Sequence, residues 1–91
     1  MTEYAMEEIL LDAEVMEPPE PLQKATLILQ QLKPGQYLRM LHRRLPYPLF
    51  ETCPQLAISY RHIAGQNSQQ IILFWRSDDL ATADFCAQIR Q

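Results

Sequence analysis

The sequence predicts an α/β (α+β) fold, a two-layer sandwich with the element order β-α-β-α-β-β and a mixed four-stranded sheet. Three observations predict it. Short apolar runs alternate with helical repeats in the first half of the chain, a proline-rich corner joins the first strand to the strongest helix, and two late strand-like runs are joined by a short polar connection. With 91 residues the chain has the length of one domain, whose core is expected over 9–76.

The first strand is expected over Glu8–Ala13, a short apolar run. The proline corner, Glu17–Leu22, follows it and starts the first helix, because prolines lack the amide hydrogens that have no partner in a first helical turn. This helix is expected to continue to about Leu32, where Lys33-Pro34-Gly35 ends it. Its packing face consists of Leu22, Ala25, Ile28, Leu29 and Leu32.

A second strand is expected over Gln36–His42, in which Leu38 and Met40 share one face with His42. A helical crossover between two such strands makes them parallel and is almost always right-handed. The first helix begins where the first strand ends, so His42 and the proline corner should lie at the same edge of the sheet. Ligand sites on open α/β sheets favour that edge.

A shorter second helix is expected after the basic turn that begins at Arg43. It should start at Tyr47 or Pro48 and end at Thr52, because Pro54 limits its length. Its prolines and short length make it the weaker of the two helices in this half of the chain.

A hairpin is expected over the strands Ala57–Ile63 and Gln70–Arg76. The second of these strands is apolar on both sides, which indicates a central strand or a covered face. The tail, 77–91, is expected to form a helix over Ser77–Ile89, capped by Ser77 or Asp78. Its apolar stripe would be Leu80, Ala83 and Ala87.

The composition, 47% hydrophobic and 21% charged, excludes an intrinsically disordered chain, and no apolar run is long enough to cross a membrane. The acidic N-terminal extension, 1–8, lacks the pattern of a secretion signal, so we expect a cytoplasmic protein. Cys53 and Cys86 form no CxxC pair, which favours reduced, buried thiols.

Charge is strongly segregated along the chain. Residues 1–20 are acidic without a base, whereas 21–76 contain seven basic residues and only one acidic residue, Glu51. Such segregation indicates either a nucleic-acid surface or acidic ends that fold back onto a basic middle. The second interpretation is favoured.

Three segments carry a resemblance to a known family. Leu11-Asp12 ends the first strand, Pro18-Pro19-Glu20-Pro21 starts the helix, and Leu32-Lys33-Pro34-Gly35 ends it. They resemble the TusA-like (SirA-like) sulfur-carrier domains, which have Cys-Pro-x-Pro at the helix start and Leu-Lys-x-Gly at its end. With His42-Arg43-Arg44-Leu45-Pro46-Tyr47-Pro48-Leu49, the chain looks like an uncharacterised branch of that superfamily. The resemblance covers roughly 9–76 and implies a TusA-like sheet in which the last strand lies between the second and third.

One difference from the family's motif argues against its sulfur-carrier chemistry. The family's sulfur-carrying cysteine aligns with Pro18, and proline cannot supply the thiolate that a helix N-terminus stabilises. The resemblance therefore implies a fold and the location of a site, and not persulfide transfer. Cys53 lies in the second-helix region and is interpreted as a packing residue.

The edge shared by His42 and the proline corner is the candidate site. Glu17 or Glu20 could orient the His42 ring or raise its pKa, although a histidine satisfied structurally at a strand end is an equally simple explanation. These two acids also disfavour a phosphate at the helix N-terminus. The predicted ligand or partner site consists of Glu17, Pro18, Pro19, Glu20, Pro21, His42, Arg43, Arg44 and Tyr47.

A metal site is a weaker hypothesis. His62 should end a strand at the same edge as His42, but the inserted last strand would separate the two by roughly 10 Å. Sharing one metal would then require the sheet to curl, and Glu17, Glu20 or Cys53 would be further ligands of such a two-histidine site. No metal or other cofactor is predicted.

The predicted function is non-catalytic binding of a protein partner or a small ligand at this edge. Sulfur or redox-metal handling is one alternative, and nucleic-acid binding through the basic middle, with Tyr47 and Tyr60 as stacking groups, is another. A homodimer or a docking partner would explain apolar residues in excess of a small core. Those residues are Leu27, Phe74, Trp75, Leu80, Phe85 and Ile89.

Overall fold

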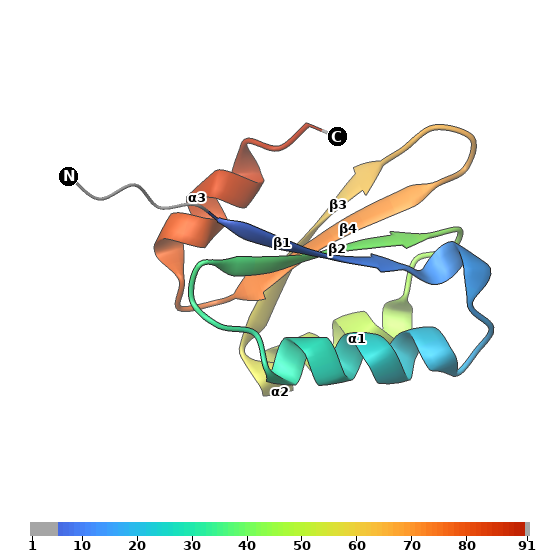
Figure 1. The fold of residues 1–91 in the computed structure, drawn as a ribbon, viewed down its shortest axis with the longest axis horizontal. Coiled ribbons are helices and arrows are strands. Elements are labelled where there is room, and N and C mark those ends of the chain that lie inside the picture. The colour runs from blue at the N-terminus through green and yellow to red at the C-terminus, as the bar shows by residue number, and fades with distance from the viewer. Residues whose placement is uncertain (1–5, 91) are drawn as a thin grey trace.

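The computed structural model describes residues 6–90. Its helices α1 and α2 cover one face of a four-stranded sheet, and α3 lies against the other face (Figure 1). The predicted α/β class, with a mixed four-stranded sheet, is confirmed. In chain order the elements are β1 (Glu7–Asp12), the 3-10 helix η1 (Ala13–Val15), α1 (Glu20–Gln30), β2 (Gln36–His42), α2 (Tyr47–Leu56), β3 (Ile58–Ala64), β4 (Gln70–Arg76) and α3 (Leu80–Ala87).

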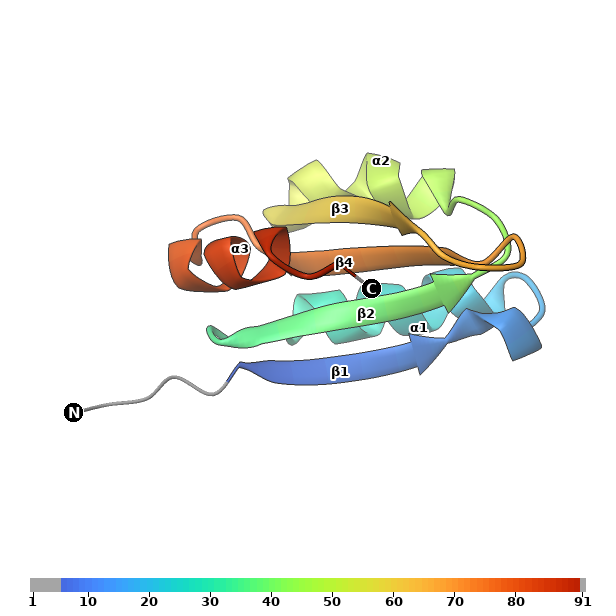
Figure 2. The ribbon, with the colours of Figure 1, turned by 90° about the horizontal axis from the view of Figure 1, so that it is seen from above.

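The strand order is β1-β2-β4-β3, and Figure 2 shows the four strands side by side. β1 and β2 are parallel, whereas β4 is antiparallel to both β2 and β3. β1, β2 and β3 therefore point the same way and end at one edge, as the crossover argument predicts. The β1–α1 and β2–α2 connections both lie at that end of the sheet (Figures 1 and 2).

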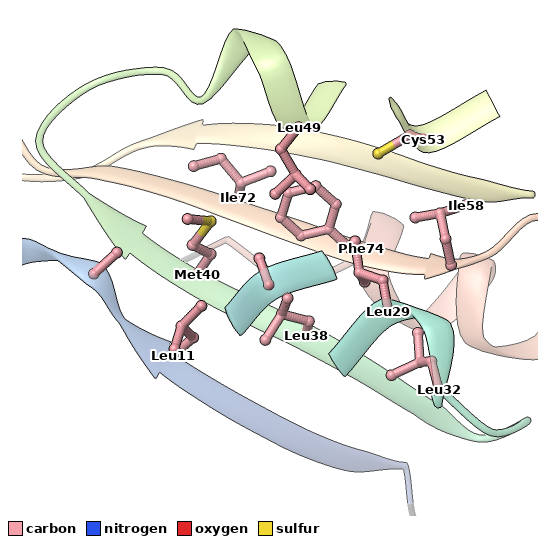
Figure 3. Packing of buried hydrophobic residues seen from close by; sticks show 12 residues of the cluster. Leu11, Leu29, Leu32, Leu38, Met40, Leu49, Cys53, Ile58, Ile72 and Phe74 are labelled. Atoms are coloured by element: carbon pink, nitrogen blue, oxygen red, sulfur yellow. The ribbon is translucent and has the colours of Figure 1, made fainter. Parts of the chain in front are cut away.

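The main core lies between the sheet and the helix pair. Met40 of β2, Phe74 of β4 and Leu49 of α2 are fully buried, and Figure 3 shows Leu49 pointing toward Phe74. A smaller cluster on the opposite face holds Leu73 and Cys86 together. β4 thus buries both of its faces, as its two apolar sides predict.

The first helix is shorter than expected. β1 begins at Glu7, one residue before the expected start, and α1 covers only Glu20–Gln30. Pro18 lies outside the helix, joined to Pro19 by a cis peptide bond, and Pro19 is the N-cap. Two of the three prolines thus precede α1, because a proline can stand before a helix as readily as in its first turn.

The second helix is longer than expected. It passes through Pro54 and ends at Leu56, so the prediction that Pro54 limits it to Thr52 is wrong. A proline inside a helix removes one N–H donor, and exposed Pro54 costs α2 that single bond near its last turn. Ala57 closes the helix in the left-handed conformation, φ 57°, which moves the start of β3 to Ile58.

The third helix packs with a different face from the one predicted. It covers Leu80–Ala87, its N-cap is Asp79 and not Ser77 or Asp78, and Leu80 and Ala87 are exposed. Asp79 sets the helix start because its carboxylate also binds the backbone N–H of Gly35 at 2.8 Å. With the helix start fixed in this way, the buried residues of α3 are Thr82 and Cys86.

α3 covers one end of the second sheet face of its own chain, which was one of two predicted uses of the tail. Phe74 is fully buried and Trp75 and Ile89 are partly buried, so these three do not supply the expected exposed apolar surface. Apolar side chains that stay exposed include Leu27, Leu80 and Phe85. A homodimer or docked partner at those residues stays a prediction.

The acidic N-terminal segment folds back onto the basic middle through Glu8–Arg39 and Glu14–Arg43, whereas the other two ion pairs join residues close in sequence. Four ion pairs each join an acid from an end of the chain to a base from the middle. They are Glu20–Lys24, Glu8–Arg39, Glu14–Arg43 and Asp78–Arg76. Exposed pairs of this kind contribute about 0–1 kcal/mol each, so their importance lies in removing free basic charge.

Part of the expected acidic N-terminal extension, 1–8, lies outside the described residues. Glu7 and Glu8 belong to β1, and residues 1–5 are not described. Within 6–90, none of the helices has the length and apolar character needed to traverse a bilayer.

Candidate ligand-binding site

The structure brings the proline corner, His42 and the β2–α2 turn together around one pocket of about 340 Å³. The pocket lies at the sheet edge where β1 and β2 end. Most of its walls are carbon, and its polar side chains are His42 and Arg44. The lining residues are Pro18, Pro19, Pro21, Leu22, Met40, His42, Arg44, Leu45, Pro46, Pro48 and Leu49.

Five predicted site residues line this pocket: Pro18, Pro19, Pro21, His42 and Arg44. The other four do not line it. Exposed Glu17 and Glu20 lie outside the lining, and Glu20 pairs with Lys24. Arg43 pairs with Glu14, and Tyr47 contacts Phe50 edge to face.

Six lining residues were missed from the sequence: Leu22, Met40, Leu45, Pro46, Pro48 and Leu49. A signal was available for three of them: Met40, Pro46 and Pro48. Met40 shares its strand face with His42, and the Pro46-Tyr47-Pro48 repeat mirrors the proline corner at a second helix start. Leu22 belongs to the predicted packing face of α1, yet it is 37% exposed because it forms a pocket wall rather than core.

The starts of two helices line the pocket. Prolines occupy the N-cap and second position of α1 and likewise of α2. Because proline has no N–H, each helix start lacks two of its usual donors and presents proline rings in their place. The helix starts therefore mainly shape the cavity, and His42 and Arg44 supply its polar side chains.

His42 is fixed by the backbone that follows it. Its Nδ1 accepts hydrogen bonds from the backbone N–H of Arg43 at 2.9 Å and of Arg44 at 3.2 Å. The ring is therefore the neutral tautomer that carries its hydrogen on Nε2. No bond is found to Nε2 within residues 6–90, and none of the fully buried side-chain polar atoms there lacks a partner, so Nε2 is open to the pocket or solvent.

The prediction that Glu17 or Glu20 raises the pKa of His42 is wrong. Partial burial lowers that pKa, the charge of Arg44 lowers it further, and Glu14 only partly opposes them. Burial acts this way because it penalises the charged imidazolium. His42 is therefore a neutral N–H donor near pH 7.

A pH dependence of stability follows from His42. Because its folded pKa lies below its unfolded value of about 6.5, the unfolded chain binds the proton more readily, and stability falls as pH drops below about 6.5 through the folded pKa. Asn can accept the same backbone N–H bonds, so we expect His42→Asn to reduce the change in unfolding free energy between about pH 8 and pH 5. Urea unfolding at several pH values measures this. Equal pH profiles of the two proteins would contradict it.

The side chain of Glu14 links the β1–α1 connection, in which it lies, to the β2–α2 turn and to the β3–β4 hairpin. It lies in η1, pairs with Arg43 at 3.8 Å, and accepts a hydrogen bond from Gln69 of the β3–β4 hairpin. Asp12 supports this turn by accepting the N–H of Glu14 at 3.0 Å. The β2–α2 turn that presents Arg44 is thereby held from its outer side.

His62 and His42 are not brought together. β4 lies between their strands, and Gln70 of β4, the register partner of His42, is hydrogen-bonded to Nε2 of His62. Cys53, a further proposed ligand, is buried in the core. Residues 6–90 contain no cluster of three or more potential metal-ligating side chains.

A second hollow lies on the opposite sheet face, beside the hairpin. Its volume is about 510 Å³, but it is an open surface depression. The charged residues in its lining, Glu8 and Arg39, pair with each other at 2.9 Å. The pocket at the proline corner has unpaired polar groups and is the better candidate site.

Comparisons with known proteins identify no family. No model of a protein family matches the chain, and no curated protein matches it. Among solved structures, the chain is similar to the METTL16 MTase domain with a TM-score of 0.54 and 15% sequence identity. The match covers 86% of this chain and 32% of that chain, so the similarity is one of fold, over about a third of that domain.

Proposed function

We propose that the pocket at the proline corner binds a small ligand, or an apolar side chain of a partner protein, without catalysing a reaction. The observation that carries the proposal is the convergence of two proline-rich helix starts and His42 on one apolar cavity of about 340 Å³. Ligand pockets have this character, apolar walls with few polar groups, and sizes from roughly 300 Å³ upward.

The chemistry of the lining supports binding rather than catalysis. The lining holds no serine, cysteine or carboxylate, so His42 has no adjacent nucleophile to activate. The Nδ1 of His42 is already occupied by two backbone donors. His42 is thus suited to donate one hydrogen bond from Nε2.

We also propose a TusA-like domain that lacks the sulfur-carrier cysteine. The strand order, with β4 between β2 and β3, supports this because the family resemblance implies that order. Sulfur handling has less support. Pro18 stands where the family has cysteine, and burial raises the pKa of the Cys53 thiol to about 11, which leaves roughly one thiolate in ten thousand at pH 7.

Nucleic-acid binding has less support too. Arg39, Arg43 and Arg76 pair with carboxylates, and Arg61 donates to the carbonyls of Cys86 and Ile89 at the end of α3. Tyr60, a proposed stacking residue, is already stacked on Phe50 with ring centroids 4.1 Å apart. Among the described residues proposed for this role, Arg44 and Tyr47 stay exposed, which is a small surface for a nucleic acid.

The proposal is tested with 4-phenylbutanamide, a neutral apolar probe, by amide chemical-shift titration. We expect shifts to cluster at the pocket, and Leu22→Gln to weaken binding by about 10-fold because it puts a polar group in the wall. Leu27→Gln is the matched control. Leu27 is 58% exposed on the same helix, outside the pocket lining, so its replacement should leave the affinity unchanged within about 2-fold. Equal losses in both variants would refute the site.

A further inference from the structure

We infer that the pocket selects a ligand that joins an apolar body to a carboxylate. The inference rests on the proposed function and adds the substrate class. Arg44 is the one charged side chain in the lining, and His42 is the one neutral polar side chain there. Both are donors, and no side chain of the lining offers an acceptor oxygen.

Arg44 is available for an external anion. Its guanidinium has no hydrogen-bond or ion-pair partner within residues 6–90, unlike those of Arg39, Arg43 and Arg76. Glu14, beside the same turn, already pairs with Arg43 and accepts a hydrogen bond from Gln69. No internal carboxylate of the described chain therefore competes for Arg44.

Nε2 of His42 is the second donor that can bind the ligand carboxylate. Because two backbone N–H groups fix Nδ1 of His42, its Nε2 can only donate. A carboxylate has two oxygens and can accept from Arg44 and from Nε2 of His42 together. Charge-assisted hydrogen bonds of this kind are roughly twice as strong as neutral ones.

The position of the carboxylate within the pocket is also set by charge. At the α1 start, the prolines offer few N–H donors and exposed Glu17 and Glu20 repel an anion. The carboxylate is therefore assigned to the Arg44 side, and the apolar body to the accessible apolar lining formed by Leu22, Leu45 and the prolines of the two helix starts. An ammonium ligand would meet Arg44 without a compensating acceptor.

The pocket size limits the body to something small. At about 340 Å³ it lies near the lower end of the range for ligand pockets, which suits one ring or a short chain. A free monocarboxylate and the C-terminal apolar residue of a peptide share this chemistry. The experiment separates these two sources.

The test compares 4-phenylbutanoate, 4-phenylbutanamide and 4-phenylbutylamine, which share one apolar body, by calorimetric or chemical-shift titration at low salt. We expect the carboxylate to bind about 10-fold more tightly than the amide, and the amine to bind most weakly. Arg44→Gln should reduce carboxylate affinity by about 10-fold and amide affinity by much less, because the neutral amide forms no salt bridge with Arg44. The tripeptide Gly-Gly-Phe with a free or amidated C-terminus forms a further arm.

Lys33→Gln is the control for bulk charge. Lys33, like Arg44, is exposed and has no ion-pair partner in the described region, but it lies at the other end of β2. Its replacement should change all affinities by less than about 2-fold. Thermal unfolding of each variant verifies folding.

Each outcome has one meaning. Amide binding equal to carboxylate binding, or an equal loss in the Lys33 variant, overturns the carboxylate inference and leaves the proposed function standing. If none of the three probes binds, both fail. Tighter binding of phenylbutanoate than of Gly-Gly-Phe supports a free small acid, and the reverse order supports a peptide C-terminus.

Discussion

Replacing Phe74 by alanine is expected to lower the free energy of unfolding by about 3–5 kcal/mol, the largest effect of a single substitution that the structure predicts. Phe74 is fully buried in β4. The centroid of its ring lies 6.3 Å from that of Phe50 and 6.1 Å from that of Tyr60. Truncation would leave a cavity between the sheet and α2. Denaturant unfolding measures the loss.

Phe85→Ala provides the comparison for Phe74→Ala. Phe85 is an aromatic residue too, but it is 42% exposed and contacts Tyr37 of β2 at the rim of the α3–sheet interface. Its truncation should cost less than about 1.5 kcal/mol, because little apolar area returns to water. If the two substitutions destabilised the protein equally, the assigned core would be wrong.

Asp79→Ala is expected to cost about 2–3 kcal/mol. The carboxylate accepts from the N–H of Gly35 at 2.8 Å, from the hydroxyl of Thr82 at 2.6 Å and from the N–H of Thr82 at 3.2 Å. Loss of a helix cap typically costs about 1 kcal/mol, and leaving the partly buried Gly35 N–H unpaired adds a comparable amount. Denaturant unfolding again measures the effect, with exposed Asp78→Ala expected to cost below about 0.5 kcal/mol.

Acidification should reduce the loss of unfolding free energy that Asp79→Ala causes. Partial burial raises the pKa of this carboxyl, but the hydrogen bonds from Thr82 and Gly35 outweigh burial and hold the pKa below its usual value. A carboxyl with a lowered folded pKa contributes stability above its unfolded pKa of about 3.9, and this is lost as pH falls through the folded value. The cost of Asp79→Ala should therefore be smaller at about pH 3 than at pH 7. A constant cost would show that the carboxylate charge contributes nothing.

The elements that follow local pattern were predicted well. The bounds of β2 and β4 agree with their alternation, and the crossover rule placed His42 at the edge that holds the proline corner. These conclusions depend on strand periodicity and chain connectivity, which act over a few residues. Long-range information was not required for them.

The failures share a different cause. The face of α3 depends on the bond from Asp79 to Gly35, 44 residues away, which no local pattern reveals. The pKa of His42 is lowered by burial and by Arg44, and the expected acids Glu17 and Glu20 have no part in it. Side-chain partners across the fold decide such details.

The pocket itself was predicted in location but not in composition. Its location followed from topology, whereas its walls depend on which apolar residues the core leaves uncovered. Leu22 has the helical spacing of a core residue, yet Pro21 and Ala25 take the buried positions of α1. Sequence spacing alone does not distinguish a wall of a cavity from a wall of the core.

The most direct test of the proposed site is a set of intermolecular nuclear Overhauser effects between bound 4-phenylbutanoate and methyl-labelled protein. Occupation of the pocket predicts contacts from the phenyl protons to the methyl groups of Leu22 and Leu45, whose accessible side chains line it. Contacts to Leu10 and Leu41 instead, which line the hollow on the opposite sheet face, would contradict it.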